Sequence, residues 1–154
     1  MLEVTSEGEQ LLKSFGVRIK KGRGRGGLAH QFWCASISDW ATGLGLDPTV
    51  EDESSGARVD VVIRVEDQEP IAVEVELTPG HEVINVSKDL ESGFSTVVSL
   101  IEDAARVDTV LAAVRDHIGT PDPGATEVLV VHLRDFRTVL GRLFEPPEAG
   151  RIVL

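Results

Sequence analysis

Three carboxylates stand at strand spacing near the middle of the chain: Asp60, Glu74 and Glu76. They belong to the stretch from Arg58 to Leu77, where apolar and polar residues alternate in two runs separated by Asp67-Gln68-Glu69. This alternation has the period of a β-strand, and two such runs joined by a short polar loop predict a hairpin. The odd-numbered residues, almost all β-branched, are predicted to form one apolar face. The other face collects the three acids.

The register of this hairpin decides how close the acids lie. If residues 67–69 form the loop, Asp60 lies opposite Glu76, with Glu74 one diagonal step away. Carboxylates roughly 6 Å apart repel by about 3 kcal/mol per pair at an effective dielectric of 20. A partly buried trio therefore needs a proton, an arginine or a metal ion beside it. One interpretation is a shared hard cation; the other is an ordinary ladder on a solvated face, with Arg58 and Arg64 pairing with the acids.

The elements that must position these acids follow from the hydrophobic pattern. Helical spacing of Leu28, Phe32, Ile37, Ala41 and Leu44 predicts the first helix. Continuous apolar runs later in the chain predict parallel strands covered by helices on both sides, so the fold class is α/β with a mixed central sheet flanked by helices. The predicted elements around the hairpin are a helix 28–44, an edge strand 47–52, a helix 81–93, a strand 96–101, a helix 102–118, a strand 127–133, a helix 135–144 and an edge strand 151–154.

Composition narrows the class of protein. A chain of 154 residues that is 42% hydrophobic can bury one ordinary core. Its single cysteine, Cys34, forms no internal disulfide and is expected to fill space on a helix, and the four histidines show no Cys/His spacing of a structural zinc site. No apolar run is long enough for a membrane span and no signal peptide is visible, so we expect a soluble, cytoplasmic protein.

The charge is unevenly distributed. The net charge of −11 argues against broad electrostatic adhesion to nucleic acid, yet residues 1–45 carry six Lys/Arg against four acids. Glycines prevent a stable helix in the segment from Arg18 to Arg25, which holds most of these cations. This segment is interpreted either as a solvated linker or as a flexible loop that binds phosphates. The candidate nucleic-acid-binding residues are Arg18, Lys20, Lys21, Arg23 and Arg25.

The sequence Asp60, then Glu74-Val75-Glu76 on the next strand, resembles the D-x(n)-(D/E)-x-(K/E) core of the PD-(D/E)xK, or restriction-endonuclease-like, nuclease superfamily. The predicted order of helix, three strands, helix and strand agrees with the αβββαβ core of that superfamily over residues 26–133. The resemblance implies a metal-dependent DNA endonuclease or a nuclease-derived DNA-processing module. It implies Mg²⁺ or Mn²⁺ held by the carboxylates of Asp60 and Glu74 and by the carbonyl of Val75.

The chain departs from the common pattern at Glu76, where most members of the superfamily carry a lysine that orients the attacking water. Some members have a glutamate there, and others place the lysine on the following helix. Lys88 is the candidate replacement because it shares a stripe of that helix with His81 and Asn85. An exposed helix lysine without a site role is the alternative.

Two short matches concern the N-terminal part. Gly26-Gly27-x-x-His30 before an amphipathic helix resembles a subgroup of these domains found attached to DNA-pumping or helicase-type ATPases, which makes His30 a candidate site residue; a satisfied helix cap is the alternative. VTSEGEQLL resembles the end of a winged-helix domain. We therefore divide the chain into residues 1–25, a helix and basic loop, and residues 26–154, a nuclease-like domain. A catalytically inactive module that binds a partner ATPase or a DNA end is the alternative function.

Overall fold

The structure is a computed structural model, and it describes residues 27–53, 55–56, 58–119 and 126–144. The predicted N-terminal helix, the basic loop from Arg18 to Arg25 and the edge strand 151–154 lie outside the described residues. None of the described helices is long and apolar enough to cross a membrane.

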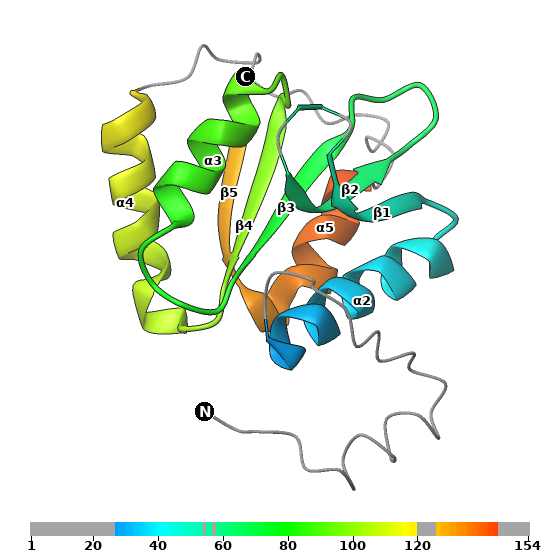
Figure 1. Cartoon of the computed structure of the whole chain (residues 1–154), viewed down its shortest axis with the longest axis horizontal. Helices are drawn as coiled ribbons and strands as arrows, with labels where there is room; N and C mark the ends of the chain where they lie inside the picture. The colour runs from blue at the N-terminus through cyan, green and yellow to red at the C-terminus, as the bar shows by residue number, and fades with distance from the viewer. Residues whose placement is uncertain (1–26, 54, 57, 120–125, 145–154) are drawn as a thin grey trace, which may run out of the picture.

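A five-stranded sheet with strand order β1-β2-β3-β4-β5 forms the middle of the domain (Figure 1). β1, β2 and β3 pair antiparallel, while β3, β4 and β5 pair parallel. This arrangement confirms the predicted α/β class with a mixed sheet. The strands are β1 (Asp47–Asp52), β2 (Val59–Arg64), β3 (Ile71–Glu76), β4 (Thr96–Ile101) and β5 (Glu127–His132).

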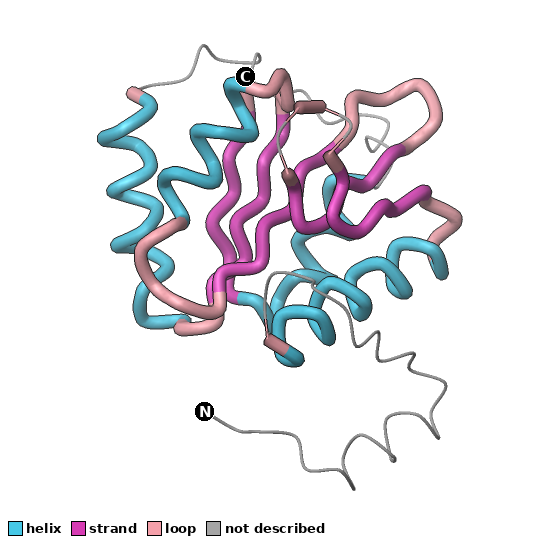
Figure 2. The backbone as a smooth tube through the Cα atoms, in the orientation of Figure 1, coloured by secondary structure: helices cyan, strands magenta, loops and turns pink. Residues whose placement is uncertain are grey.

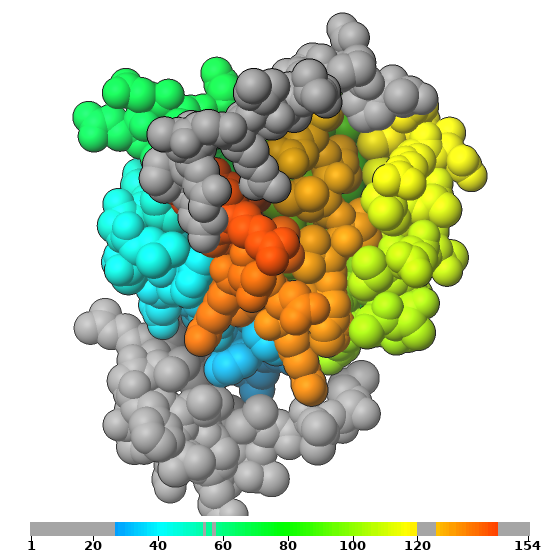
Figure 3. All heavy atoms as spheres, turned by 180° about the vertical axis from the view of Figure 1, so that it is seen from behind, coloured from blue at the N-terminus to red at the C-terminus, as the bar shows by residue number. Residues whose placement is uncertain are grey.

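Helices cover both faces of the sheet, as the parallel strands require (Figures 1 and 2). α3 and α4 pack on one face of the sheet, and α2 and α5 pack on the other. In the view from behind, α5 appears between α2 and α4 (Figure 3). α4 begins at Val107, whereas the prediction began this helix at residue 102. The reason is that the Asp103 side chain accepts a hydrogen bond from the Ala105 N–H and caps a short 3-10 turn before the helix. The helices are α2 (Leu28–Gly43), α3 (Glu82–Glu91), α4 (Val107–Ile118) and α5 (Phe136–Phe144), with 3-10 turns η1 (Ala104–Arg106) and η2 (Leu133–Asp135).

Two hydrophobic clusters hold these layers together. The first joins α2 and α5 to the sheet, and the second joins α3 and α4 to its other face. All six residues of β3 are buried. The hairpin therefore has no solvated face of the kind that the arginine-ladder interpretation needs.

The buried stripe of α2 differs from the prediction. Phe32 and Leu44 are 51% and 54% exposed, whereas Cys34, Ile37 and Ala41 are buried. The predicted role of Cys34 as a small filler in the core is confirmed. Its neighbour one turn earlier on this stripe is His30, so the stripe carries a polar residue at its N-terminal end.

The register of the β2–β3 hairpin is also different. The predicted register pairs Val61 with Val75, but Val61 lies opposite Val73 and Ile63 opposite Ile71. Both registers place the same side chains on the same faces because side chains repeat every two residues along a strand, so the alternation could not distinguish them. Val59 does not share the face of Val61 as predicted; it packs in the second cluster. The prediction that the three acids gather on one face is also wrong, because the next residue, Asp60, contacts α2, whereas Glu74 and Glu76 contact α3.

Candidate functional site

The candidate site begins where β2 and β3 cease to pair. Beyond the Val61–Val73 pair, the Asp60 side chain takes the place of a β2 backbone acceptor: its Oδ2 accepts a hydrogen bond of 2.9 Å from the Val75 N–H. The N–H and C=O of one strand residue point toward the same neighbouring strand. The Val75 carbonyl therefore faces the same gap as the Asp60 carboxylate.

The neighbouring residue of β3 confirms this orientation. The carbonyl of Glu76 accepts a hydrogen bond of 3.2 Å from the N–H of Glu102, which follows β4. Glu76 thus directs its backbone toward β4, and Val75, one residue earlier, directs its own toward β2. The gap between β2 and β3 consequently presents two oxygen donors, one from each strand.

His30 fixes the Asp60 carboxylate from the α2 side. The His30 Nε2 lies 3.0 Å from the Asp60 Oδ2. This hydrogen bond, despite the opposing effect of burial, raises the pKa of His30. Burial of Asp60 favours its protonated form, but the hydrogen bonds from His30 and Val75 outweigh it and lower the pKa of Asp60. His30 is therefore the ion-pair partner of Asp60 and not the cap of α2, where the N-cap residue is Gly27 without a side-chain cap.

Glu74 is the most perturbed carboxyl group of the site. Its side chain is buried, 3% exposed, and it interacts electrostatically with Asp60. Burial first, and then the charges of Asp60 and Asp89, raise the pKa of Glu74 to about 10. These effects outweigh the opposing effect of the Lys88 ammonium, so the protonated form of Glu74 is favoured at neutral pH when no metal ion is bound.

Lys88 of α3 contacts Glu74 of β3. Its Nζ lies 2.9 Å from the Glu74 Oε1, 3.3 Å from the Asp89 Oδ1 and 2.5 Å from the Arg58 carbonyl oxygen. Burial of the ammonium lowers the pKa of Lys88, but the contacts with Glu74 and Asp89 outweigh burial and raise it. The Lys88 ammonium thus faces the carboxyl groups of Glu74 and Asp89.

Glu76 belongs to a separate contact. The Asn85 Nδ2 donates a hydrogen bond of 2.7 Å to the Glu76 Oε1, and burial is the main cause that raises the pKa of Glu76. The prediction that Asp60 lies opposite Glu76 is wrong because it followed from the wrong register. The close pair of carboxyl groups is Asp60 and Glu74, and Glu76 lies further along β3 toward the start of α3.

Asp89 is a member of the site that the sequence analysis missed. It is completely buried on α3, and burial raises its pKa while Glu74 and Lys88 lie against it. Neither of its two carboxyl oxygens has a hydrogen-bond partner among the described residues. A signal was available: Glu82, Val86 and Asp89 follow helical spacing and are the buried residues of α3.

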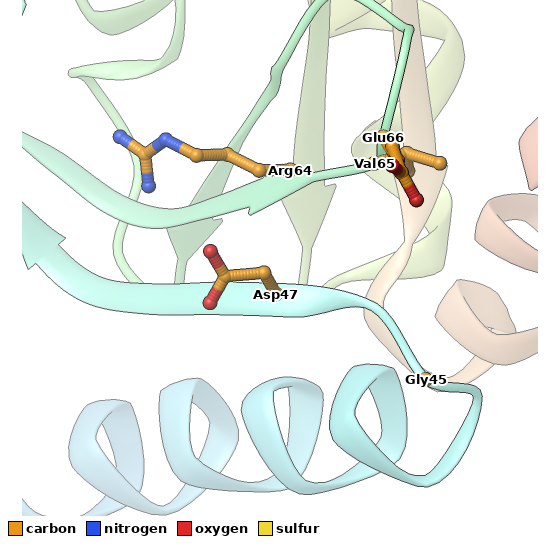
Figure 4. Close-up of a pocket in the computed structure, with 5 residues that line it drawn as sticks. All are labelled: Gly45, Asp47, Arg64, Val65 and Glu66. Atoms are coloured by element: carbon orange, nitrogen blue, oxygen red, sulfur yellow. The ribbon is translucent and has the colours of Figure 1, made fainter.

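The two arginines of the hairpin do not neutralise this site. Arg58 pairs with Glu51 at 2.8 Å and Arg64 with Asp52 at 2.5 Å, and both partners come from β1. The arginine-ladder interpretation of the three acids is therefore wrong. Arg64 instead lines a surface hollow with Asp47 and Glu66 at the opposite end of β2 (Figure 4), which contains none of the predicted site residues.

Cys34 completes the surroundings of Asp60. Its Sγ lies 3.7 Å from the His30 Nδ1, and burial, followed by the charge of Asp60, raises the pKa of the thiol well above its ordinary value. A thiol held in its protonated form is a poor nucleophile.

The donors at the gap are oxygens, the Asp60 carboxylate and the Val75 carbonyl, and the carboxyl group of Glu74 interacts with the charge of Asp60. This set fits a hard divalent cation, which prefers carboxylate and carbonyl oxygens together with water. The five cations from Arg18 to Arg25 lie outside the described residues and are not placed relative to it. No family model, no curated protein and no solved structure matches this chain, so the geometry of the site carries the functional argument.

Proposed function

We propose that this protein is a metal-dependent phosphodiesterase that hydrolyses DNA, built on the restriction-endonuclease-like αβββαβ core. The observation that carries the proposal is the Asp60 carboxylate seated in the gap between β2 and β3 against the Val75 backbone, with Glu74 beside it. The element order from α2 to β4 agrees with the proposed core. Mg²⁺ or Mn²⁺ is the proposed cofactor.

Asp60, Glu74 and the Val75 carbonyl would hold the cation. A hard cation at this place supplies activation of a water molecule and neutralises negative charge at the scissile phosphate. His30 keeps Asp60 ionised and oriented, because its Nε2 forms a hydrogen bond with the Asp60 Oδ2. Both hydrogen bonds to Asp60 use that oxygen, so Oδ1 is the atom that would contact the cation.

Lys88 is proposed to supply the positive charge that most related nucleases carry on β3. Its ammonium already lies 2.9 Å from the Glu74 Oε1. From there it would orient the attacking water and stabilise the charge that develops in the transition state. Glu76, bound to Asn85, would contribute to the outer part of the site.

The direct test is incubation of the purified protein with single-stranded, double-stranded and branched DNA in Mg²⁺, in Mn²⁺ and with a chelator. Cleavage that needs the cation is the expected result. Absence of cleavage on every substrate with either cation would contradict the proposal and leave a module that binds a DNA end or a partner ATPase. The choice of substrate also reveals the preferred strandedness.

The basic loop gives a separate prediction about DNA binding. If Arg23 and Arg25 contact phosphates, replacing both with alanine should weaken binding to all DNA sequences alike and reduce the slope of log affinity against log salt by about 0.9 per lost contact. Arg115→Ala with Arg134→Ala is a matched control, because both arginines are exposed and the change in net charge is the same. An equal slope in the loop variant and the wild type would show that the loop is only a linker.

A further inference from the structure

We propose that His30, Cys34 and Asp60 form a binding site for Zn²⁺, which shares Asp60 with the proposed magnesium site and otherwise uses different ligands. The three residues offer one imidazole nitrogen, one sulfur and one carboxylate oxygen. These donor atoms all lie within 4.8 Å of one another.

The helix brings two of these ligands together. His30 and Cys34 are four residues apart on α2, and residues at this spacing lie one above the other on the same face. The Cys34 Sγ lies 4.0 Å from the His30 Nε2, which in turn lies 3.0 Å from the Asp60 Oδ2. Zn²⁺ binds nitrogen at about 2.0 Å and sulfur at about 2.3 Å. Tetrahedral ligands at those lengths are separated by roughly 3 to 4 Å, so small side-chain movements would close the site.

The mixture of donors selects the kind of ion. Sulfur and imidazole are ligands for zinc and other late transition metals, whereas magnesium and calcium prefer oxygen donors alone. The two sides of Asp60 therefore differ in chemistry: oxygens of β3 on one side, and nitrogen and sulfur of α2 on the other. Three protein ligands leave the fourth position of a tetrahedral ion to water.

A zinc ion can reach the three ligands from solvent, and the protons that it displaces can leave to solvent. The side chains of His30 and Asp60 are 16% and 20% exposed, so an ion can approach from their outer edge while Cys34 closes the inner side. The thiol proton leaves to solvent as the sulfur–zinc bond forms. The proton shared between the His30 Nε2 and Asp60 also leaves, and the ring keeps its proton on Nδ1.

Sharing of Asp60 has a functional consequence, which rests on the proposed function. Zinc bound at the Asp60 Oδ2 would replace the hydrogen bonds from His30 and Val75 and take up part of the negative charge of the carboxylate, so Zn²⁺ should inhibit Mg²⁺-supported cleavage. The binding itself does not depend on cleavage. Sequence spacing did not indicate this site because its third ligand comes from a strand 30 residues further along the chain.

The test replaces zinc with Co²⁺, whose bond to a thiolate gives a charge-transfer band in the near ultraviolet. Cys34 is the only cysteine of the chain, so any such band reports this site. Wild-type protein should show the band with one equivalent of Co²⁺, and Zn²⁺ should abolish it by displacement. Cys34→Ala should remove the band and weaken Zn²⁺ binding by about a hundredfold, and His30→Ala, which leaves the buried thiol in place, should weaken it similarly.

Two further variants separate this proposal from the proposed function. His132→Ala is the matched control, since His132 lies 3.7 Å from Asp135 without a thiol nearby, and it should bind Zn²⁺ like the wild type. Glu74→Gln should keep the cobalt band whether or not the protein is a nuclease. A wild type without the band, or a Cys34→Ala variant with unchanged Zn²⁺ affinity, would overturn the proposal.

Discussion

Replacing Glu74 with glutamine is expected to reduce metal-supported DNA cleavage by about a thousandfold or more. Glutamine has the shape of a protonated glutamic acid, the form that the raised pKa of Glu74 favours at neutral pH, so the fold should be retained. It cannot lose a proton to become a carboxylate, and it therefore removes a charged ligand of the proposed cation. Initial cleavage rates at saturating Mn²⁺ would measure the loss.

Glu82→Gln is the matched control for this variant. Glu82 is 4% exposed, close to the 3% of Glu74, and it also pairs with a cation, at 2.6 Å from the Arg106 guanidinium. Its pKa is lowered instead of raised, because backbone and Arg106 hydrogen bonds outweigh the effect of burial. Glu82→Gln should cleave DNA like the wild type. Wild-type rates in Glu74→Gln would exclude Glu74 as a metal ligand.

The second large effect is expected from Lys88→Met, which should lower the cleavage rate by about a hundredfold or more, or roughly 3 kcal/mol of transition-state stabilisation. Methionine keeps much of the apolar stem of lysine but removes the ammonium beside Glu74. Since this charge is proposed to act on the water and on the transition state, kcat should fall while affinity for DNA changes little.

Arg106→Met provides the comparison for Lys88→Met. Arg106 is 30% exposed and Lys88 32%, and each pairs with a buried acid, Glu82 on α3 and Glu74 on the facing strand β3. A rate loss in Lys88→Met but not in Arg106→Met would assign the effect to the site and not to a general loss of an ion pair. Equal rates in both variants and the wild type would make Lys88 a structural residue only.

Much of the fold could be predicted because local patterns and tertiary packing agree. The strands Asp47–Asp52 and Thr96–Ile101 have the predicted bounds, since their apolar and turn residues mark both ends. The hairpin register could not be predicted, because a shift of two residues preserves every face. The buried stripe of α2 was predicted wrongly because Phe32 and Leu44 fit a helical period just as closely as Cys34, Ile37 and Ala41, which are the buried residues.

The site was predictable in its residue types but not in its contacts. Asp60 and Glu74 stood out by their spacing, and their proximity in the structure agrees with that expectation. The pairing of His30 with Asp60 and the burial of Asp89 depend on packing between segments far apart in the chain. A charged residue on a helix is usually solvated, whereas Asp89 is completely buried, with the Lys88 ammonium 3.3 Å from its Oδ1.

The central claim, that Asp60, Glu74 and Val75 hold a hard cation, is tested most directly by calorimetric titration of the protein with Mn²⁺ in two buffers of different ionisation enthalpy. The pKa of Glu74 is about 10, so at neutral pH the cation must displace its proton. Affinity should consequently rise with pH, by up to about tenfold per unit below pH 10. The predicted result is one Mn²⁺ bound with release of about one proton by the wild type, and loss of both the tight binding and the proton release in Glu74→Gln. Mn²⁺ binding of equal affinity in wild type and Glu74→Gln, without proton release, would contradict the claim.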